Sequence, residues 1–367
     1  MKAWVLEEKG KLRLKETEKP KPSGGEVLLR VMAAGLCGSD IQRIYETGAH
    51  HMPLISGHEF SGVVESVGDN VSADWIGTRA GVFPLIPCGK CPACREKKYE
   101  MCRRYSYLGS RADGGFAEYV KVPEWNLIEL SEEVNFEQAA LLEPMAVAVH
   151  AMRRTEIAQD AVVAVAGLGS IGQFLIMFLL ERGIRNILAV GNSDAQKSSV
   201  LSLGLTERQY CGINAADAVQ FLLENTAGRG VGVFFDCAGK NETVEMAFDS
   251  TASGGQICIV GNPCSDMRFD KETWWKLLRR QLRISGTWNS TYYGREDEDA
   301  SADDWNYVLD RIRDGRIHPE QMISHRLSME ELEKGLLIMR DKTEPYTKIM
   351  ISQPDNRRRI QMRTVQR

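Results

Sequence analysis

Four cysteines stand close together in the first third of the chain. Cys88, Cys91, Cys94 and Cys102 have the spacing C-x2-C-x2-C-x7-C. Four thiolates at such spacing close a tetrahedral site with no open position, which is typical of a structural zinc ion. An iron–sulfur cluster also uses four thiolates and is the alternative. We expect the metal to stiffen a loop of small residues that cannot bury a core of its own.

A glycine-rich turn follows about sixty residues later. Gly167, Gly169 and Gly172 spell G-x-G-x-x-G after the apolar run 161–167 and before a helical pattern over 170–183. In a dinucleotide-binding turn the first glycine makes the tight turn, the second admits the pyrophosphate, and the third lets helix and strand pack closely. The helix N-terminus then attracts the phosphates. The predicted cofactor-binding residues of this turn are Gly167, Leu168, Gly169, Ser170, Ile171 and Gly172.

The end of the next predicted strand, 186–190, departs from the usual pattern. An acidic residue is expected there to bind the ribose hydroxyls of adenosine, but the sequence has Gly191, and Asp194 lies further into the loop. We predict that Asn192 and Ser193 also bind the cofactor. Without a carboxylate at the strand end, a 2′-phosphate is repelled less, and Ser193 with Lys197 could help to bind one. The cofactor is therefore expected to be NAD, with NADP possible.

Three further residues suggest a second metal site. Cys37 lies in AGLCGSD, His58 in SGHEFSG and Glu143 in LLEPMAV. One sulfur, one nitrogen and one oxygen ligand leave a fourth tetrahedral position open, as in a catalytic zinc site. Asp40 and Glu59 flank these ligands and are expected to orient or tune them. Cobalt or manganese at this site are alternatives.

The bulk composition excludes several classes of function. The chain has 367 residues, 43% of them hydrophobic and 26% charged, and a net charge of −4, which does not suit a nucleic-acid partner. No run reaches the roughly 18 apolar residues of a membrane span. Nine cysteines in a long chain with no signal peptide favour metal binding in a reducing cytoplasm. The basic run 356–367 is interpreted as a frayed tail or an added extension.

The elements that must position these residues fall into two groups. The start of the chain predicts a β-hairpin, and short apolar runs at 26–35, 60–68 and 114–122 predict a β-rich region over 1–125. A helical pattern covers 137–155. From 160, strands at 161–167, 186–190, 231–239 and 254–262 alternate with helices, which predicts a doubly wound parallel sheet. Helices are expected again at 302–314 and 328–341. The run 254–264 either pairs sheets across a two-fold axis or belongs to the core.

Taken in order, these motifs resemble those of the zinc-containing medium-chain alcohol and polyol dehydrogenases. The resemblance rests on GHEFSGVVESVG at 57–68, CGSD at 37–40, the four-cysteine loop, DGGFAEY at 113–119, EP at 143–144 and GLGSIG at 167–172, and it covers residues 2–352. It implies an α/β fold with a GroES-like catalytic domain at 1–145 and 287–367, and a Rossmann domain at 146–286.

The resemblance also implies roles for single residues. In the sorbitol-dehydrogenase branch of this family, the positions of Cys37, His58 and Glu143 bind the catalytic zinc, and the position of Glu59 holds a carboxylate that can approach the metal. Ser39 matches the hydroxyl that passes on the substrate proton. The four-cysteine loop matches the structural zinc site. The zinc would polarise an alcohol as a Lewis acid while the nicotinamide accepts a hydride.

The substrate expectation is a small polyol or polyol phosphate. Longer stretches, including 35–62, 105–120 and 323–336, are most similar to dehydrogenases of phosphorylated polyols such as galactitol 1-phosphate. Arg43, His50 and Arg111 are candidates for binding a phosphate, since a guanidinium fork suits it, and Asn289 is a candidate for a hydroxyl. Free sorbitol, arabitol phosphate and threonine are alternative substrates, and a non-catalytic NAD(P)-binding protein is the alternative outside enzymes. The family resemblance implies a homodimer or homotetramer.

Overall fold

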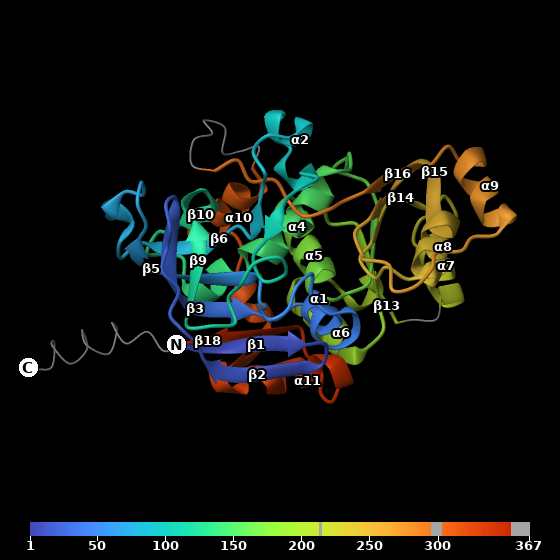
Figure 1. The fold of residues 1–367 in the computed structure, drawn as a ribbon. Coiled ribbons are helices and arrows are strands. Elements are labelled where there is room, and N and C mark those ends of the chain that lie inside the picture. The colour runs from blue at the N-terminus through green and yellow to red at the C-terminus, as the bar shows by residue number, and fades with distance from the viewer. Residues whose placement is uncertain (213–214, 295–302, 354–367) are drawn as a thin grey trace, which may run out of the picture. The chain divides into compact units, whose positions relative to one another are not determined.

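The computed structural model describes residues 1–212, 215–294 and 303–353 and divides into two compact units (Figure 1). The first unit contains Met1–Glu143 and the described residues from Thr291 onward. The second is Pro144–Ser290. The first unit is therefore built from two distant parts of the chain, with the second inserted between them. The basic run 356–367 lies outside the described residues.

Mostly antiparallel strands form the core of the first unit. Its largest sheet has the order β10-β6-β5-β3-β18-β17, and β9 also pairs with β3. β3 reads EVLLRVMAAG and is buried along nearly its whole length, because Val27, Leu29 and Val31 pack into the same core as Phe60 of β5. The predicted hairpin is confirmed as β1 paired with β2. The strands of this unit are β1 (Lys2–Glu8), β2 (Lys11–Glu16), β3 (Glu26–Gly35), β4 (Leu54–Ile55), β5 (Glu59–Val67), β6 (Arg79–Val82), β7 (Leu85–Ile86), β8 (Ser106–Tyr107), β9 (Tyr119–Pro123), β10 (Leu127–Glu129), β17 (Ile323–Leu327) and β18 (Lys348–Ser352).

Short helices connect these strands. They are α1 (Gly38–Ile41), η1 (Gln42–Thr47), η2 (Ala73–Trp75), α2 (Pro92–Arg95), η3 (Tyr99–Met101), η4 (Glu124–Asn126), α3 (Phe136–Ala140), α10 (Asp304–Arg313), η6 (Pro319–Met322), η7 (Met329–Glu331) and α11 (Leu332–Asp341). α4 (Leu142–Arg153) begins in the first unit and continues in the second.

The second unit contains the predicted doubly wound sheet. Six parallel strands follow the order β13-β12-β11-β14-β15-β16. The chain runs outward from β11 to β13, returns to β14 beside β11, and then runs outward to β16. Ligands of such sheets bind where the order reverses, at the carboxyl ends of β11 and β14. The elements are β11 (Val163–Ala166), α5 (Ser170–Glu181), β12 (Ile187–Gly191), α6 (Asp194–Ser202), η5 (Glu207–Gln209), β13 (Tyr210–Gly212), α7 (Ala215–Glu224), β14 (Val231–Asp236), α8 (Asn241–Ser250), β15 (Thr251–Ile259), α9 (Lys271–Arg279) and β16 (Arg283–Gly286).

The fold supports one sequence alternative and corrects one expectation. For the run 254–264 it supports the core, because β15 is paired on both sides, with β14 and β16, and Ile257 and Cys258 are buried. The strand expected at 114–122 begins only at Tyr119. Gly114 and Gly115 instead press against Gly57 and Phe60, where an added Cβ would lie 2.0 Å and 2.6 Å from the nearest atoms. Among the described residues, no helix is long and apolar enough to cross a membrane.

Candidate functional site

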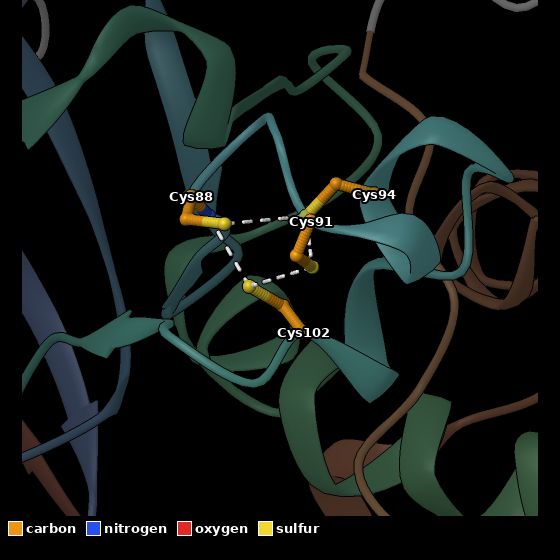
Figure 2. A group of neighbouring side chains, drawn as sticks. All are labelled: Cys88, Cys91, Cys94 and Cys102. Carbon is orange, nitrogen blue, oxygen red and sulfur yellow. Dashed lines mark hydrogen bonds between the residues drawn. The ribbon is translucent and has the colours of Figure 1, made fainter.

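The four cysteines of the predicted structural site converge (Figure 2). Cys88 follows β7, Cys91 is the N-cap of α2, Cys94 lies inside α2, and Cys102 is the C-cap of η3. The Cys91 Sγ lies 3.4 Å from the Cys94 Sγ and 3.9 Å from the Cys102 Sγ, and the Cys88 Sγ lies 3.9 Å from the Cys94 Sγ. Zinc–sulfur bonds of about 2.3 Å in a tetrahedron place the sulfurs about 3.8 Å apart. The spacing therefore fits a single zinc ion, and a four-iron cage would hold the sulfurs further apart.

The thiols in this group have opposed proton affinities. The backbone N–H of Lys90 is the main cause that lowers the pKa of Cys88 to about 6. Burial raises the pKa of Cys94 to about 12, and the neighbouring thiols add to the effect. Negative charge on four sulfurs this close is costly without a cation among them, and a bound zinc ion would supply that positive charge.

A second group brings together sulfur, nitrogen and oxygen ligands. Ligand atoms of Cys37, His58 and Glu59 lie within 4.8 Å of one another, with His58 and Glu59 buried. Cys37 is at the end of the turn after β3 and caps α1, while His58 and Glu59 lead into β5. β3 and β5 pair as antiparallel neighbours, with Gly35 opposite Glu59, so the sheet itself brings these residues together. A mixed donor set of this kind suits zinc with an open position.

Asp40 contacts two members of this group, Cys37 and His58. Its buried carboxylate accepts a hydrogen bond of 3.0 Å from the Cys37 backbone N–H and one of 2.8 Å from Arg43 Nη1. Its Oδ1 lies 3.5 Å from Nδ1 of His58. Although burial opposes ionisation, His58 and Arg43 outweigh it and hold the pKa of Asp40 below its usual range. A carboxylate beside one ring nitrogen fixes the imidazole and leaves the other nitrogen to bind a metal.

Glu59 has a cationic partner that the sequence analysis did not identify. Its carboxylate forms an ion pair with Lys348 of β18, and both side chains are almost fully buried. Burial opposes the charged form of Lys348, yet Glu59 outweighs it and raises the pKa of Lys348. The signal that could have indicated this pair is a lysine in the otherwise apolar strand KIMIS.

Glu143 lies nearby but has a different partner. Its Oε1 accepts a hydrogen bond of 3.0 Å from the Tyr107 hydroxyl, and Tyr107 in turn lies with its ring centroid 6.0 Å from that of His58. Burial raises the pKa of Glu143 and also that of Tyr107, so the phenol keeps its proton and donates the hydrogen bond to Glu143. Within the described residues, the group of closest ligand atoms contains Glu59 rather than Glu143. The assignment of Glu143 as third ligand stays a prediction.

The predicted substrate residues have separate environments. Arg43 pairs with Asp40 and is mostly buried. The Arg111 guanidinium carbon lies 4.7 Å from the centroid of the Tyr105 ring. Burial lowers the pKa of His50, and the charges of Arg111 and Arg43 lower it further, so both guanidinium groups disfavour the protonated form of this imidazole.

The last two predicted residues are Ser39, expected to pass on a proton, and Asn289, expected to bind a hydroxyl. Ser39 is half-buried in α1. Asn289 belongs to the second unit, where its Oδ1 accepts a hydrogen bond of 2.9 Å from the Ser290 N–H.

The glycine turn of the second unit has the geometry of a dinucleotide site. Gly167 has a φ of +89°, and an added Cβ would lie 2.6 Å from the Ala238 nitrogen, so only glycine fits. A Cβ on Gly172 would lie 2.1 Å from the Gly167 oxygen, which shows the close packing of helix on strand. A Cβ on Gly169, the N-cap of α5, would meet nothing within 4 Å, and this leaves room for a phosphate. Buried Gln173, which the sequence analysis missed, donates a hydrogen bond of 2.8 Å to the Leu168 oxygen and supports the turn.

Comparison with known proteins agrees with this geometry. Residues 23–132 match the family model of the alcohol dehydrogenase GroES-like domain, and residues 170–310 match that of zinc-binding dehydrogenases. The chain therefore belongs to the zinc-binding, medium-chain alcohol dehydrogenase family, and the expected GroES-like and Rossmann folds are confirmed. It is a zinc-dependent oxidoreductase.

Three relatives illustrate the match. Galactitol 1-phosphate 5-dehydrogenase of Escherichia coli (strain K12) is 31% identical over 92% of this chain and 95% of its own length. The crystal structure of galactitol-1-phosphate dehydrogenase from Escherichia coli has a TM-score of 0.86 at 29% identity, over 96% of this chain and 100% of that one. A putative zinc-binding dehydrogenase from Sinorhizobium meliloti 1021, bound to NADP, has a TM-score of 0.85 at 26% identity, over 96% and 99% of the two chains.

Proposed function

We propose that the protein oxidises a secondary hydroxyl of a polyol phosphate of the galactitol 1-phosphate type and transfers the hydride to NAD(P)+. The observation that supports the substrate class is that two guanidinium groups contact the metal group or its neighbours: Arg43 pairs with Asp40, and Arg111 lies on the Tyr105 ring. Contacts lead from these residues to the metal group: Arg111 lies on the Tyr105 ring, Tyr105 packs on Tyr107 with centroids 6.2 Å apart, and Tyr107 binds Glu143. The 31% identical relative from Escherichia coli is named for this substrate.

The cationic group suits a phosphate better than a free polyol. A phosphate carries up to two negative charges and three strong acceptor oxygens. Arg111 contributes more than Arg43, because Asp40 already neutralises Arg43, whereas the Arg111 guanidinium rests on an aromatic face. His50 adds a neutral N–H donor, because burial and the two guanidinium groups lower its pKa. A neutral polyol would gain little from this arrangement.

The chain's own residues have separate tasks in the reaction. Zinc, when bound, supplies a Lewis acid that lowers the pKa of the substrate hydroxyl, and the nicotinamide accepts the hydride. Cys37, His58 and a carboxylate from Glu59 or Glu143 hold the ion. Asp40 keeps His58 oriented through its 3.5 Å contact with Nδ1. The Ser39 hydroxyl accepts the proton that leaves the substrate oxygen and passes it toward solvent.

The test is a substrate panel on the zinc-loaded protein, with reduction of NAD+ and NADP+ followed at 340 nm. We expect galactitol 1-phosphate to have a higher kcat/KM than galactitol, sorbitol, arabitol phosphate or threonine. In Arg111→Ala, KM for the phosphorylated substrate should rise about tenfold or more, while any turnover of free polyols stays unchanged. Lys21→Ala, which removes an exposed charge in the same unit, is the matched control. A preference for free sorbitol in both wild type and Arg111→Ala would refute the phosphate, and no turnover of any alcohol would refute the enzyme.

We also propose that two or four copies of the chain assemble. The second unit has large exposed hydrophobic side chains in one stretch, namely Trp274, Trp275, Leu278, Ile284 and Trp288. Ile284 lies in β16, one of the two outer strands of the parallel sheet, and an outer strand with an exposed apolar side chain favours pairing with a second copy. Light scattering after size exclusion should give a multiple of 41.1 kDa, and Ile284→Lys with Trp288→Lys should give the monomer.

A further inference from the structure

The carboxyl end of β12 is where the adenosine ribose of a dinucleotide lies in a sheet of this type. β12 ends at Gly191, which has no side chain to bind ribose hydroxyls. The nearest carboxylate along the chain is Asp194, the exposed first residue of α6. The feature that normally selects NAD is therefore missing from the strand end.

The space beside Gly191 is already filled. An added Cβ would lie 2.8 Å from Leu168 Cδ1, 2.9 Å from Gln196 Oε1 and 2.9 Å from Tyr210 Cε2. Leu168 belongs to the glycine turn itself, so this packing joins the turn to the end of β12. A carboxylate side chain cannot be accommodated here unless its neighbours move.

The two flanking side chains also fix the loop that follows. Gln196 Oε1 accepts a hydrogen bond of 2.8 Å from the Asn192 N–H, and the Tyr210 hydroxyl donates one of 3.1 Å to the Ser193 oxygen. The loop is thereby held in one shape, and it presents Asn192 and Ser193 as exposed, neutral side chains.

The start of α6 presents hydrogen-bond donors to the solvent. Ser193 is the N-cap of α6, and its Oγ accepts from the Gln196 N–H at 3.3 Å, which leaves the hydroxyl proton to be donated outward. The first amides of a helix have no partner within it, and they attract anions. Lys197 follows one turn along α6 in an exposed ion pair with Glu207. Exposed pairs of this kind are weak, so the ammonium can turn to a stronger anion.

We propose that the adenosine end of this site selects a 2′-phosphate, and that the cofactor is NADP(H) rather than NAD(H). Ser193 and Asn192 donate hydrogen bonds to the phosphate oxygens, and Lys197 supplies the charge. This inference rests on the proposed function, since it concerns the nucleotide of that same reaction.

The test compares two ligands that differ only by the 2′-phosphate. Isothermal titration calorimetry on the full-length protein measures Kd for adenosine 2′,5′-bisphosphate and for adenosine 5′-monophosphate. We expect the bisphosphate to bind at least about tenfold more tightly, because charge-assisted hydrogen bonds are the strong ones. Lys197→Ala should weaken only the bisphosphate.

Ser193→Asp is the decisive variant, because aspartate is as good an N-cap as serine and keeps the helix start. It should weaken the bisphosphate at least about tenfold while the Kd of the monophosphate changes by less than about twofold. Ser202→Asp, at the exposed far end of the same helix, is the charge-matched control and should leave both unchanged. Asp194→Asn should not weaken the monophosphate.

The other outcomes overturn the inference in distinguishable ways. Equal or tighter binding of the monophosphate refutes selection of the 2′-phosphate but leaves the proposed function standing. Weaker monophosphate binding in Asp194→Asn would show that Asp194 holds the ribose as in an NAD site. If neither ligand binds, this inference fails together with the dinucleotide site of the proposed function.

Discussion

Removing the buried cation Lys348 is expected to destabilise the first unit strongly. Lys348 and Glu59 are 2% and 1% exposed and face each other as an ion pair. In Lys348→Met the chain keeps most of its side-chain volume, but the Glu59 carboxylate stays buried without its cation. Breaking a buried pair in this way costs about 3–5 kcal/mol.

The surroundings give the carboxylate little chance to relax. An added Cβ on Gly35 would lie 3.0 Å from Lys348 Cε and closer still to the Glu59 carboxylate, so β3 packs directly on the pair. β18 also pairs with β3 through Ala33–Gly35, so the backbone that carries Lys348 is held in the sheet. We therefore expect the loss in the free energy of unfolding to lie in the upper part of this range.

Scanning calorimetry with zinc held at one concentration for all variants is the assay, because any ion that binds only the native state shifts the apparent stability. For a unit of this size the loss corresponds to a fall of about 6–20 °C in the melting temperature of the first unit. Lys9→Met, at an exposed lysine, should stay within about 0.5 kcal/mol of wild type. The double variant Lys348→Met with Glu59→Gln should recover about 1–3 kcal/mol relative to Lys348→Met. If Lys348→Met melts with the wild type, the ion pair does not compensate the buried charge as argued.

Three further predictions concern the metal sites and one helix cap. Cys94→Ser should lower bound zinc by about one equivalent per chain in elemental analysis and reduce the melting temperature, since the loop has no core without its ion; unchanged zinc content would exclude a four-thiolate site. Tyr107→Phe removes the donor to Glu143 and should lower metal affinity about 10–100-fold in a chelator competition, whereas an unchanged affinity would assign Tyr107 to packing alone. Asp303 caps α10, and burial raises its pKa to about 6. The folded state therefore favours the protonated acid, and the contribution of Asp303 to the free energy of unfolding falls as pH rises from about 4 through 6. Asp303→Asn keeps the cap without titrating, and its melting temperature relative to wild type should therefore be higher at pH 7.5 than at pH 4.5; a difference independent of pH would contradict the shift.

Local signals were sufficient to predict much of the architecture. The apolar run of β11, the glycine spacing of 167–172 and the helix after it determine a strand, a tight turn and a packed helix within a few residues. The four-cysteine loop is equally local, because its ligands lie within one short stretch. The alternation of strands and helices after 160 likewise predicted the parallel sheet that the structure has.

The contacts around the proposed metal group could not be predicted from local sequence signals. Lys348 reaches Glu59 only because β18 pairs with β3 and β3 with β5, which brings together residues far apart in sequence. Tyr107 reaches Glu143 from the two-stranded β7–β8 sheet. In the sequence, a lysine in an apolar strand and a lone tyrosine do not indicate which distant residues they will contact. The pairing of Arg43 with Asp40 was missed for another reason: the spacing i, i+3 is common on exposed helices, and only burial makes it structural.

The charges of the buried group account for the kind of ion it should hold. Asp40 and Arg43 neutralise each other, and a metal-binding His58 is neutral. With a metal bound, Cys37 as a thiolate, Glu59 and Glu143 would contribute three negative charges against the single positive charge of Lys348. In the protein chain alone, burial raises the pKa of Glu143, and Asp40 raises the pKa of His58 against the opposing effect of its burial, so both shifts add protons to the group. A divalent cation would supply the missing two positive charges and would favour a neutral His58 with ionised carboxylates. Each carboxylate also has its own partner within the chain, since Lys348 pairs with Glu59 and the Tyr107 hydroxyl donates a hydrogen bond to Glu143.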